Sequence, residues 1–152
     1  LWTDFNKGDP MAKIAAKFSM NDYKQIRVGS NYRKLDIADV QHLHFSAMLF
    51  LKSIDYTKPT VVITHHAPHI NGIDSNRYGR GGLGSELNYS YFTDLEEFIK
   101  EKQPLLWVFG HTHKYTKFKI DKTLVYSNPR GYETNTFSEG VEGFDPLETL
   151  EI

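Results

Sequence analysis

The sequence contains no cysteine, which excludes disulfide bonds, thiolate metal ligands and thiol nucleophiles. It also lacks a basic excess: 18 Lys and Arg face 19 Asp and Glu, so nothing indicates a protein that follows a nucleic-acid backbone. Apolar runs are short, and Ala47–Leu51 is far below the roughly 18 residues that span a bilayer. No signal-peptide pattern opens the chain. These absences predict a soluble, cytoplasmic protein that binds neither nucleic acid nor membrane.

What the sequence does contain is enough for a folded core. Its 152 residues are 39% apolar, 24% charged and 14% aromatic, a balance typical of a globular protein. With no linker or repeat, we expect residues 1–152 to form a single domain. The chain starts without Met, and Leu1–Phe5 resembles the middle or end of a strand. We therefore expect it to be part of a longer protein.

Local patterns predict a mixed α/β fold. Asp9-Pro10 is a helix-start signal, and apolar residues at helical spacing predict a long helix from Asp36 to about Ile54. Thr93 with Glu96 suggests a capping box for a further helix. Five short apolar segments predict strands, the first of them covered on both faces: residues 60–64, 105–109, 115–120, 123–127 and 147–152. The order strand, helix, strand predicts parallel pairing of the first two strands, and the next two form an antiparallel hairpin.

Five of the seven histidines follow two of these strands. His65, His66 and His69 come after the first strand, and His111 and His113 after the second. Ligands gather outside the carboxyl ends of parallel strands, so both clusters are expected at one crevice. Neighbouring residues of an extended chain point apart, so only one of His65 and His66 is expected to be a ligand. Either pair alone is more often explained by surface or core histidines, but two pairs at the ends of neighbouring strands indicate a divalent metal site as readily.

Two segments carry a family resemblance. Val61–Pro68 (VVITHHAP) and Leu106–His113 (LWVFGHTH) resemble the last two metal-binding motifs of calcineurin-like metallophosphoesterases. Leu1–Phe5, Met20–Tyr23 and Ser127–Tyr132 are similar to segments of a bacterial and phage-type branch of that family, in the same order. The resemblance implies a two-sheet αββα sandwich and metal-dependent hydrolysis of phosphate esters at a dinuclear metal centre.

The same resemblance implies which histidines bind metal and which ligands the chain lacks. His65, His111 and His113 correspond to the family's histidine ligands for two divalent ions, with Mn the first candidate before Fe or Zn. The family's carboxylate motifs Asp-x-His, Gly-Asp-x-x-Asp and Gly-Asn-His-Glu are absent. The chain is thus expected to be the C-terminal part of such a domain. A missing N-terminal half or a partner chain would supply carboxylates, and a phosphorylated compound would be the substrate.

Other candidates have two interpretations each. His66 is either a catalytic residue or a support for the ligands, and His69 is a weaker candidate for substrate binding. Asn128 and Arg130 either bind substrate or stabilise the turn around Pro129. Arg77 and Arg80 lie in a glycine-rich loop that either contacts phosphate or forms plain surface. The alternative to the enzyme is a non-catalytic metal-binding or interaction fragment of a phosphoesterase.

Overall fold

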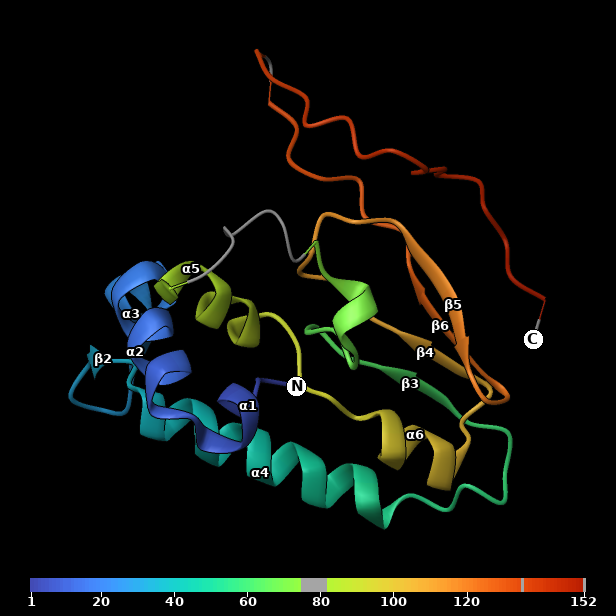
Figure 1. Ribbon diagram of the computed structural model, residues 1–152, viewed down its shortest axis with the longest axis horizontal. Coiled ribbons are helices and arrows are strands. Elements are labelled where there is room, and N and C mark those ends of the chain that lie inside the picture. Colours follow the sequence, from blue (N-terminus) through green and yellow to red (C-terminus); the bar gives the residue numbers. More distant parts are fainter. Residues whose placement is uncertain (75–81, 135, 152) are drawn as a thin grey trace.

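The computed structural model describes residues 1–74, 82–134 and 136–151, and the predicted loop residues Arg77 and Arg80 lie outside these ranges. Figure 1 shows a group of helices beside a twisted sheet. The helical elements are α1 (Phe5–Gly8), α2 (Pro10–Ser19), α3 (Asp22–Gln25), α4 (Ile37–Ser53), η1 (Ile70–Gly72), α5 (Gly82–Leu87), η2 (Asn88–Ser90) and α6 (Glu96–Lys102). The strands are β1 (Arg27–Val28), β2 (Arg33–Lys34), β3 (Val61–Ile63), β4 (Leu106–Val108), β5 (Thr116–Ile120) and β6 (Thr123–Ser127).

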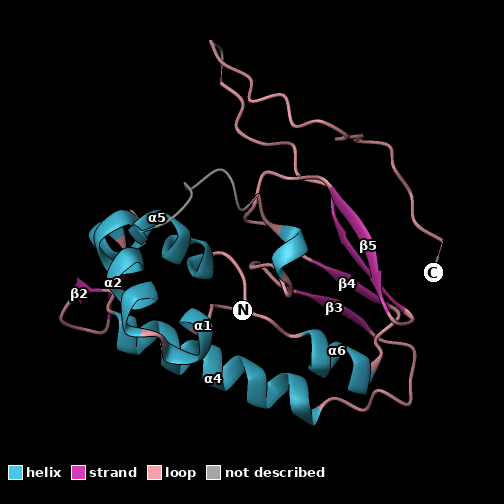
Figure 2. Ribbon diagram, in the orientation of Figure 1, coloured by secondary structure: helices cyan, strands magenta, loops and turns pink. Residues whose placement is uncertain are grey.

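The strands of the main sheet are magenta in Figure 2, and Figure 1 labels them; their order is β3-β4-β6-β5. Strand β4 pairs in parallel with β3 on one side and with β6 on the other, and β5 runs antiparallel to β6. The predicted parallel pairing and the predicted hairpin are both confirmed. The second sheet of the described residues is only the β1–β2 hairpin. The mixed α/β class is therefore confirmed, whereas two large facing sheets are not seen within the described ranges.

Two strand predictions are wrong. Strand β3 is an edge strand of the described sheet, so only Val62 is buried and Ile63 is 76% exposed, not covered on both faces as expected. The tail after residue 146 forms no strand up to residue 151. It is instead held by side chains, because the Glu148 carboxylate accepts hydrogen bonds from Tyr115, Lys117 and Tyr126.

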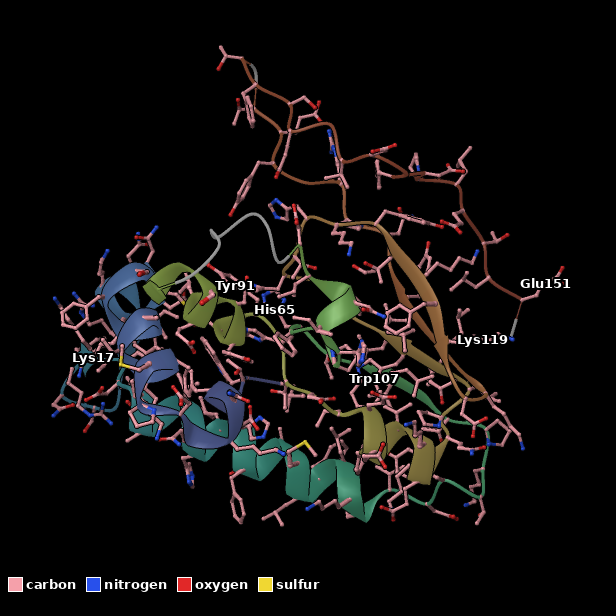
Figure 3. All side chains as sticks on the ribbon, in the orientation of Figure 1. Lys17, His65, Tyr91, Trp107, Lys119 and Glu151 are labelled. Atoms are coloured by element: carbon pink, nitrogen blue, oxygen red, sulfur yellow. The ribbon has the colours of Figure 1, made fainter. Side chains whose placement is uncertain are left out.

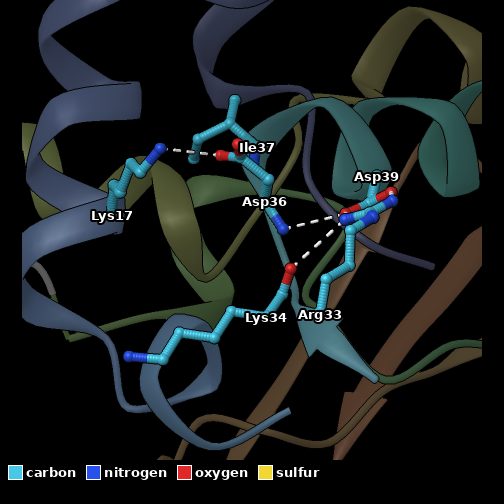
Figure 4. A network of polar contacts seen from close by, with 6 residues as sticks. All are labelled: Lys17, Arg33, Lys34, Asp36, Ile37 and Asp39. Atoms are coloured by element: carbon cyan, nitrogen blue, oxygen red, sulfur yellow. Dashed lines mark hydrogen bonds and ion pairs between the residues drawn. The ribbon is translucent and has the colours of Figure 1, made fainter. Parts of the chain in front are cut away.

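Helix α4 begins where its sequence predicted. The Asp36 side chain accepts from the Ile37 amide at 2.7 Å, and the Asp39 carboxylate accepts from the Asp36 amide at 2.9 Å, forming a capping box (Figure 4). Arg33 donates to both Asp39 oxygens at 2.6 Å, and Lys17 of α2 pairs with Asp36 at 2.9 Å. The start of α4 is thereby tied to α2 and to β2. Within the described residues, none of the helices is both long and apolar enough to cross a membrane.

Helix α6 begins differently from the prediction. Thr93 does not cap it, because the helix starts at Glu96 and its amide donates to the Asp94 carboxylate at 3.1 Å. Thr93 is buried, and its hydroxyl accepts from the Asp4 amide at 3.3 Å. The residue therefore joins the N-terminal segment to the loop before α6. The Thr93 hydroxyl thus binds a residue distant in sequence instead of capping α6.

The core consists of two apolar clusters. One lies around the sheet and α6, centred on the fully buried Trp107, and the other lies among α1 to α4, around the fully buried Phe5 and Val40. Tyr89 and Tyr91 pack against both clusters. The segment around them is thus the seam between helices and sheet. This seam reaches the carboxyl ends of β3 and β4, where the histidines lie.

Candidate functional site

The backbone at the ends of β3 and β4 brings the two histidine clusters together. The Thr64 amide donates to the Val108 carbonyl at 2.9 Å, and the Gly110 amide donates to the His65 carbonyl at 3.1 Å. These bonds continue the parallel pairing two residues beyond the strands. The expectation that both clusters meet at one edge of the sheet is therefore confirmed, although the residues are 46 positions apart.

His65, His66 and His111 form a compact group of three imidazoles. His65 Nε2 lies 2.8 Å from His111 Nδ1, so one nitrogen donates to the other. The His66 ring centroid lies 5.3 Å from that of His65 and 4.5 Å from that of His111. Both neighbours therefore contact His111, contrary to the expectation that they point apart. The reason is that the chain bends at residues 65 and 66 and does not continue as a strand.

Packing explains how this group is held. His111 has a positive φ of 64°, which turns its side chain out of the line of β4, and Tyr91 stacks on its ring at 5.2 Å. Figure 3 shows His65 and Tyr91 between the helices and the sheet, with Trp107 beneath them in the core. The Trp107 indole donates to the Thr64 hydroxyl at 3.0 Å, and that hydroxyl donates to the His66 carbonyl at 2.9 Å. The core thus fixes the backbone beneath the histidines.

Two ring nitrogens of this group are buried without a partner among the described residues: His66 Nε2 and His111 Nε2. His66 Nδ1 lies 2.6 Å from the Leu1 carbonyl, which can only accept. The proton of His66 therefore sits on Nδ1, and its Nε2 presents a lone pair. Burial, reinforced by the charge of His111, lowers the pKa of His66 to about 3, so this ring is neutral at pH 7.

The neighbouring rings are shifted in the same direction. Burial, with the charge of His65 second, lowers the pKa of His111 to about 4, while the Asp22 carboxylate opposes that shift. Burial likewise lowers the pKa of His65, and Asp22 again opposes it. Neutral imidazole is the form that binds metal ions. The group is therefore in ligand-competent form at neutral pH.

His113 joins the site from the other side of His111. Its Nδ1 lies 2.5 Å from Glu139 Oε2, and the Tyr132 ring meets its ring edge to face at 4.5 Å. His111 and His113 both line a cavity of about 290 Å³. The complete lining is Ser19, Met20, Asn21, Asp22, Tyr91, His111, His113 and Tyr132. We call this cavity together with His65 and His66 the histidine pocket.

Sequence reasoning missed three contributors to this pocket. Asp22 and Tyr91 line it, and Glu139 contacts His113 from the C-terminal tail. Asp22 lies in a segment that carried part of the family resemblance, but no pattern placed its carboxylate near the histidines. The sequence held no signal for Glu139, which comes from an irregular segment 26 residues after His113.

A second group that could hold a metal ion lies elsewhere. His69, Asp94 and Glu96 each offer a ligand atom, all within 4.8 Å of one another. His69 Nδ1 accepts from the Asn71 amide at 3.1 Å, and Glu96 pairs with Lys100 at 2.8 Å. A cation there would compete with the lysine for the carboxylate. His69, predicted to bind substrate, thus belongs to this group and does not line the histidine pocket.

The two remaining predicted residues have contacts of their own. The Asn128 amide donates to the Asp145 carbonyl at 2.7 Å and its oxygen accepts from the Asp145 amide at 3.2 Å. Arg130 is exposed and pairs with Glu133 at 2.8 Å. The substrate-binding role of both stays a prediction, and to fulfil it each side chain would have to leave these partners.

Among the described residues, only His69, Asp94 and Glu96 bring three ligand atoms within 4.8 Å of one another. The histidine pocket nevertheless has residue types that suit divalent metal ions. It offers several neutral imidazoles, two buried unpartnered nitrogens and the Asp22 carboxylate, and Mn, Fe and Zn all accept such ligands. The ligand roles of His65, His111 and His113 stay predictions. Only one carboxylate lines the cavity in the described part of the chain, so the set is poorer in anionic oxygen than a two-metal centre normally requires.

Comparison with known proteins corrects the family assignment. No protein-family model matches the chain. The predicted membership in the calcineurin-like metallophosphoesterases is wrong, since the similarity found is one of fold, to a phosphopantetheinyl hydrolase. The chain is 30% identical over 135 residues to the uncharacterised protein L509 of Acanthamoeba polyphaga mimivirus, covering 79% of this chain and 45% of that protein.

The fold is similar to that in the crystal structure of phosphopantetheinyl hydrolase (PptH) from Mycobacterium tuberculosis. The TM-score is 0.56 with 16% sequence identity, and the similarity covers 87% of this chain and 48% of PptH. The chain thus spans about half the length of L509 and of PptH. At this identity the likeness establishes the fold: these residues adopt a mixed α/β fold that is also found in a hydrolase.

Proposed function

We propose that the histidine pocket binds divalent metal ions and hydrolyses phosphate esters with them. The observation that carries the proposal is the His65, His66 and His111 group, in which two ring nitrogens are buried without a partner among the described residues. Leaving a buried polar atom unpaired costs about 1–3 kcal/mol. A purely structural cluster has no need of two such atoms, whereas in the proposed site His111 Nε2 would bind a metal ion and His66 Nε2 would accept a hydrogen bond from water or substrate.

The proposal gives each residue of the pocket a role. His65, His111 and His113 would hold two divalent ions, Mn before Fe or Zn, and Asp22 would add a carboxylate. Such ions, when bound, supply polarisation of the phosphoryl oxygens and a water of lowered pKa. His66 is neutral with its proton on Nδ1, so its Nε2 can accept a hydrogen bond from water or substrate but cannot serve as a general acid at pH 7.

The proposal extends to carboxylates from outside these 152 residues. The described pocket wall carries only Asp22 as an acidic residue, and the chain matches about half of both related proteins. Another segment or a partner chain would complete the ligand set. The substrate would be a phosphorylated compound, and the name of PptH makes a phosphopantetheinyl ester one candidate.

The test compares metal content and hydrolysis in matched variants. The wild-type chain and the variants His111→Ala, His69→Ala and His42→Ala are loaded with Mn²⁺, freed of loose metal by gel filtration and analysed for bound metal. His42 is exposed on α4 and serves as the control for losing a histidine. Hydrolysis of an aryl phosphate monoester, an aryl phosphodiester and a phosphopantetheinyl ester is measured in parallel.

Each outcome separates the alternatives. Loss of metal and turnover in His111→Ala, with both retained in His69→Ala and His42→Ala, supports the proposal. Loss of metal only in His69→Ala would move the metal site to the second group and overturn the ligand assignment. Metal bound in the histidine pocket without turnover of any ester would contradict hydrolysis by these 152 residues alone and leave a non-catalytic metal-binding fragment.

A further inference from the structure

The C-terminal tail places one carboxylate directly behind His113. Glu139 Oε2 lies 2.5 Å from His113 Nδ1 and accepts a second hydrogen bond from the Tyr132 amide at 3.0 Å. Both the His113 and the Glu139 side chains are only 19% exposed. An ionised carboxylate only accepts hydrogen bonds. The proton of this hydrogen bond must therefore come from His113 Nδ1, and the tautomer with that proton has its lone pair on Nε2.

The loop around Tyr132 is built to receive this carboxylate. The Glu139 amide donates to the Tyr132 carbonyl at 2.9 Å, and a bridge between Glu133 and Ser138 folds the chain back on itself. Gly131 has a φ of +78°, and a Cβ at this position would lie 3.0 Å from Glu139 Oε2 and 2.8 Å from Val141 Cγ2. A Cβ there would force the Val141 side chain to shift and would press on Glu139, so the glycine leaves room for the contact.

We propose that Glu139 is a positioning residue that fixes the tautomer and orientation of His113 and so presents His113 Nε2 to a metal ion in the histidine pocket. The inference rests on the proposed function for its metal, but the hydrogen bond and the tautomer belong to this chain alone. A metal-ligating histidine commonly donates its other N–H to a carboxylate, and loss of that partner typically lowers metal affinity by about 10–100-fold. Neither motif around the histidines contains Glu139.

The experiment first determines the tautomer of His113 and then measures the affinity for Zn²⁺. Nitrogen-15 correlation spectra of labelled histidines, recorded on the metal-free chain, distinguish a ring protonated on Nδ1 from one protonated on Nε2. They are compared for wild type, Glu139→Ala, Glu139→Gln and the control Glu142→Ala, an exposed glutamate of the same tail. Zn²⁺ affinity is then measured by calorimetry for the same four proteins.

We expect Nδ1–H at His113 in wild type, a shift toward Nε2–H in Glu139→Ala, and largely retained Nδ1–H in Glu139→Gln, whose amide oxygen can still accept. Zn²⁺ affinity should fall about 10–100-fold in Glu139→Ala, less in Glu139→Gln, and stay unchanged in Glu142→Ala. An unchanged His113 tautomer in Glu139→Ala would overturn the inference. A shifted tautomer in a chain that binds no Zn²⁺ even as wild type would support the positioning and overturn the metal proposal instead.

Discussion

The hydrogen bonds of Thr64 allow a quantitative test of how the core supports the histidine pocket. Its hydroxyl accepts from the indole N–H of Trp107 and donates to the His66 carbonyl, at 3.0 and 2.9 Å. Trp107 is fully buried, so its N–H has no access to water. Replacing Thr64 with Val keeps the size and the branched Cβ of the side chain while removing both hydrogen bonds. The Thr64→Val variant therefore measures the contribution of the hydroxyl group to stability.

The expected magnitude follows from the two groups left behind. A buried indole N–H without a partner costs about 1–3 kcal/mol, and the lost bond to the His66 carbonyl about 0.5–1.5 kcal/mol more. We expect Thr64→Val to lower the free energy of unfolding by about 2–4 kcal/mol. For a chain of 152 residues that is a fall in Tm of at least about 4 °C.

The assay is urea unfolding followed by tryptophan fluorescence and circular dichroism, arranged as a double-mutant cycle with Trp107→Phe. Phenylalanine has no N–H, so Thr64→Val should cost about 1–2 kcal/mol less in the Trp107→Phe background. The control is Thr60→Val, whose hydroxyl donates to the Lys58 carbonyl just before β3. A coupling energy near zero, or a loss no larger than that of Thr60→Val, would refute the reasoning.

Two further predictions concern the same region. Burial lowers the pKa of His66 to about 3 and of His111 to about 4 in the folded protein. Below the ordinary histidine pKa near 6.5, the unfolded chain therefore binds more protons than the folded one. The free energy of unfolding of the metal-free protein should fall by roughly 1 kcal/mol per pH unit and per histidine as pH falls from about 6.5 toward 4. Flat stability over that interval in urea titrations would contradict the burial of both rings. Replacing Gly72 with Ala puts a Cβ 2.7 Å from Phe109 Cζ and 2.8 Å from Ala67 Cβ, so overpacking should cost about 1–3 kcal/mol. Thermal unfolding measures that loss, and an unchanged Tm would show that the phenyl ring moves away freely.

The parts of the fold that could be predicted from the sequence are those fixed by neighbouring residues. Asp36 predicts the start of α4 because its carboxylate accepts from the adjacent helical amides, and the β5–β6 hairpin follows from two apolar segments joined at Asp121. The meeting of the histidine clusters was also predictable, since it requires only that two parallel strands end at the same edge. In these cases local chemistry and final contact agree.

The parts that could not be predicted depend on segments that are distant in sequence. Ile63 belongs to a strand-like apolar segment, but its 76% exposure depends on which strands lie beside β3. Asp22 reaches the histidine pocket only because α3 packs there, and Glu139 contacts His113 only because the tail folds back over Tyr132. No periodicity or cap encodes such contacts. Thr93 shows the opposite error, a plausible local cap used for a tertiary hydrogen bond.

The hydrogen bond between His66 and the Leu1 carbonyl has a practical consequence for preparing the protein. Anything fused ahead of Leu1 begins beside the imidazoles, and an oligohistidine tag at that end would bring competing ligands to the pocket. Glu148 is tied to β5 and β6, and Glu151 beyond it is exposed. A tag at that end starts beside the β5–β6 hairpin. Metal stoichiometry is therefore best measured on chains purified through the C-terminus and cleaved before loading.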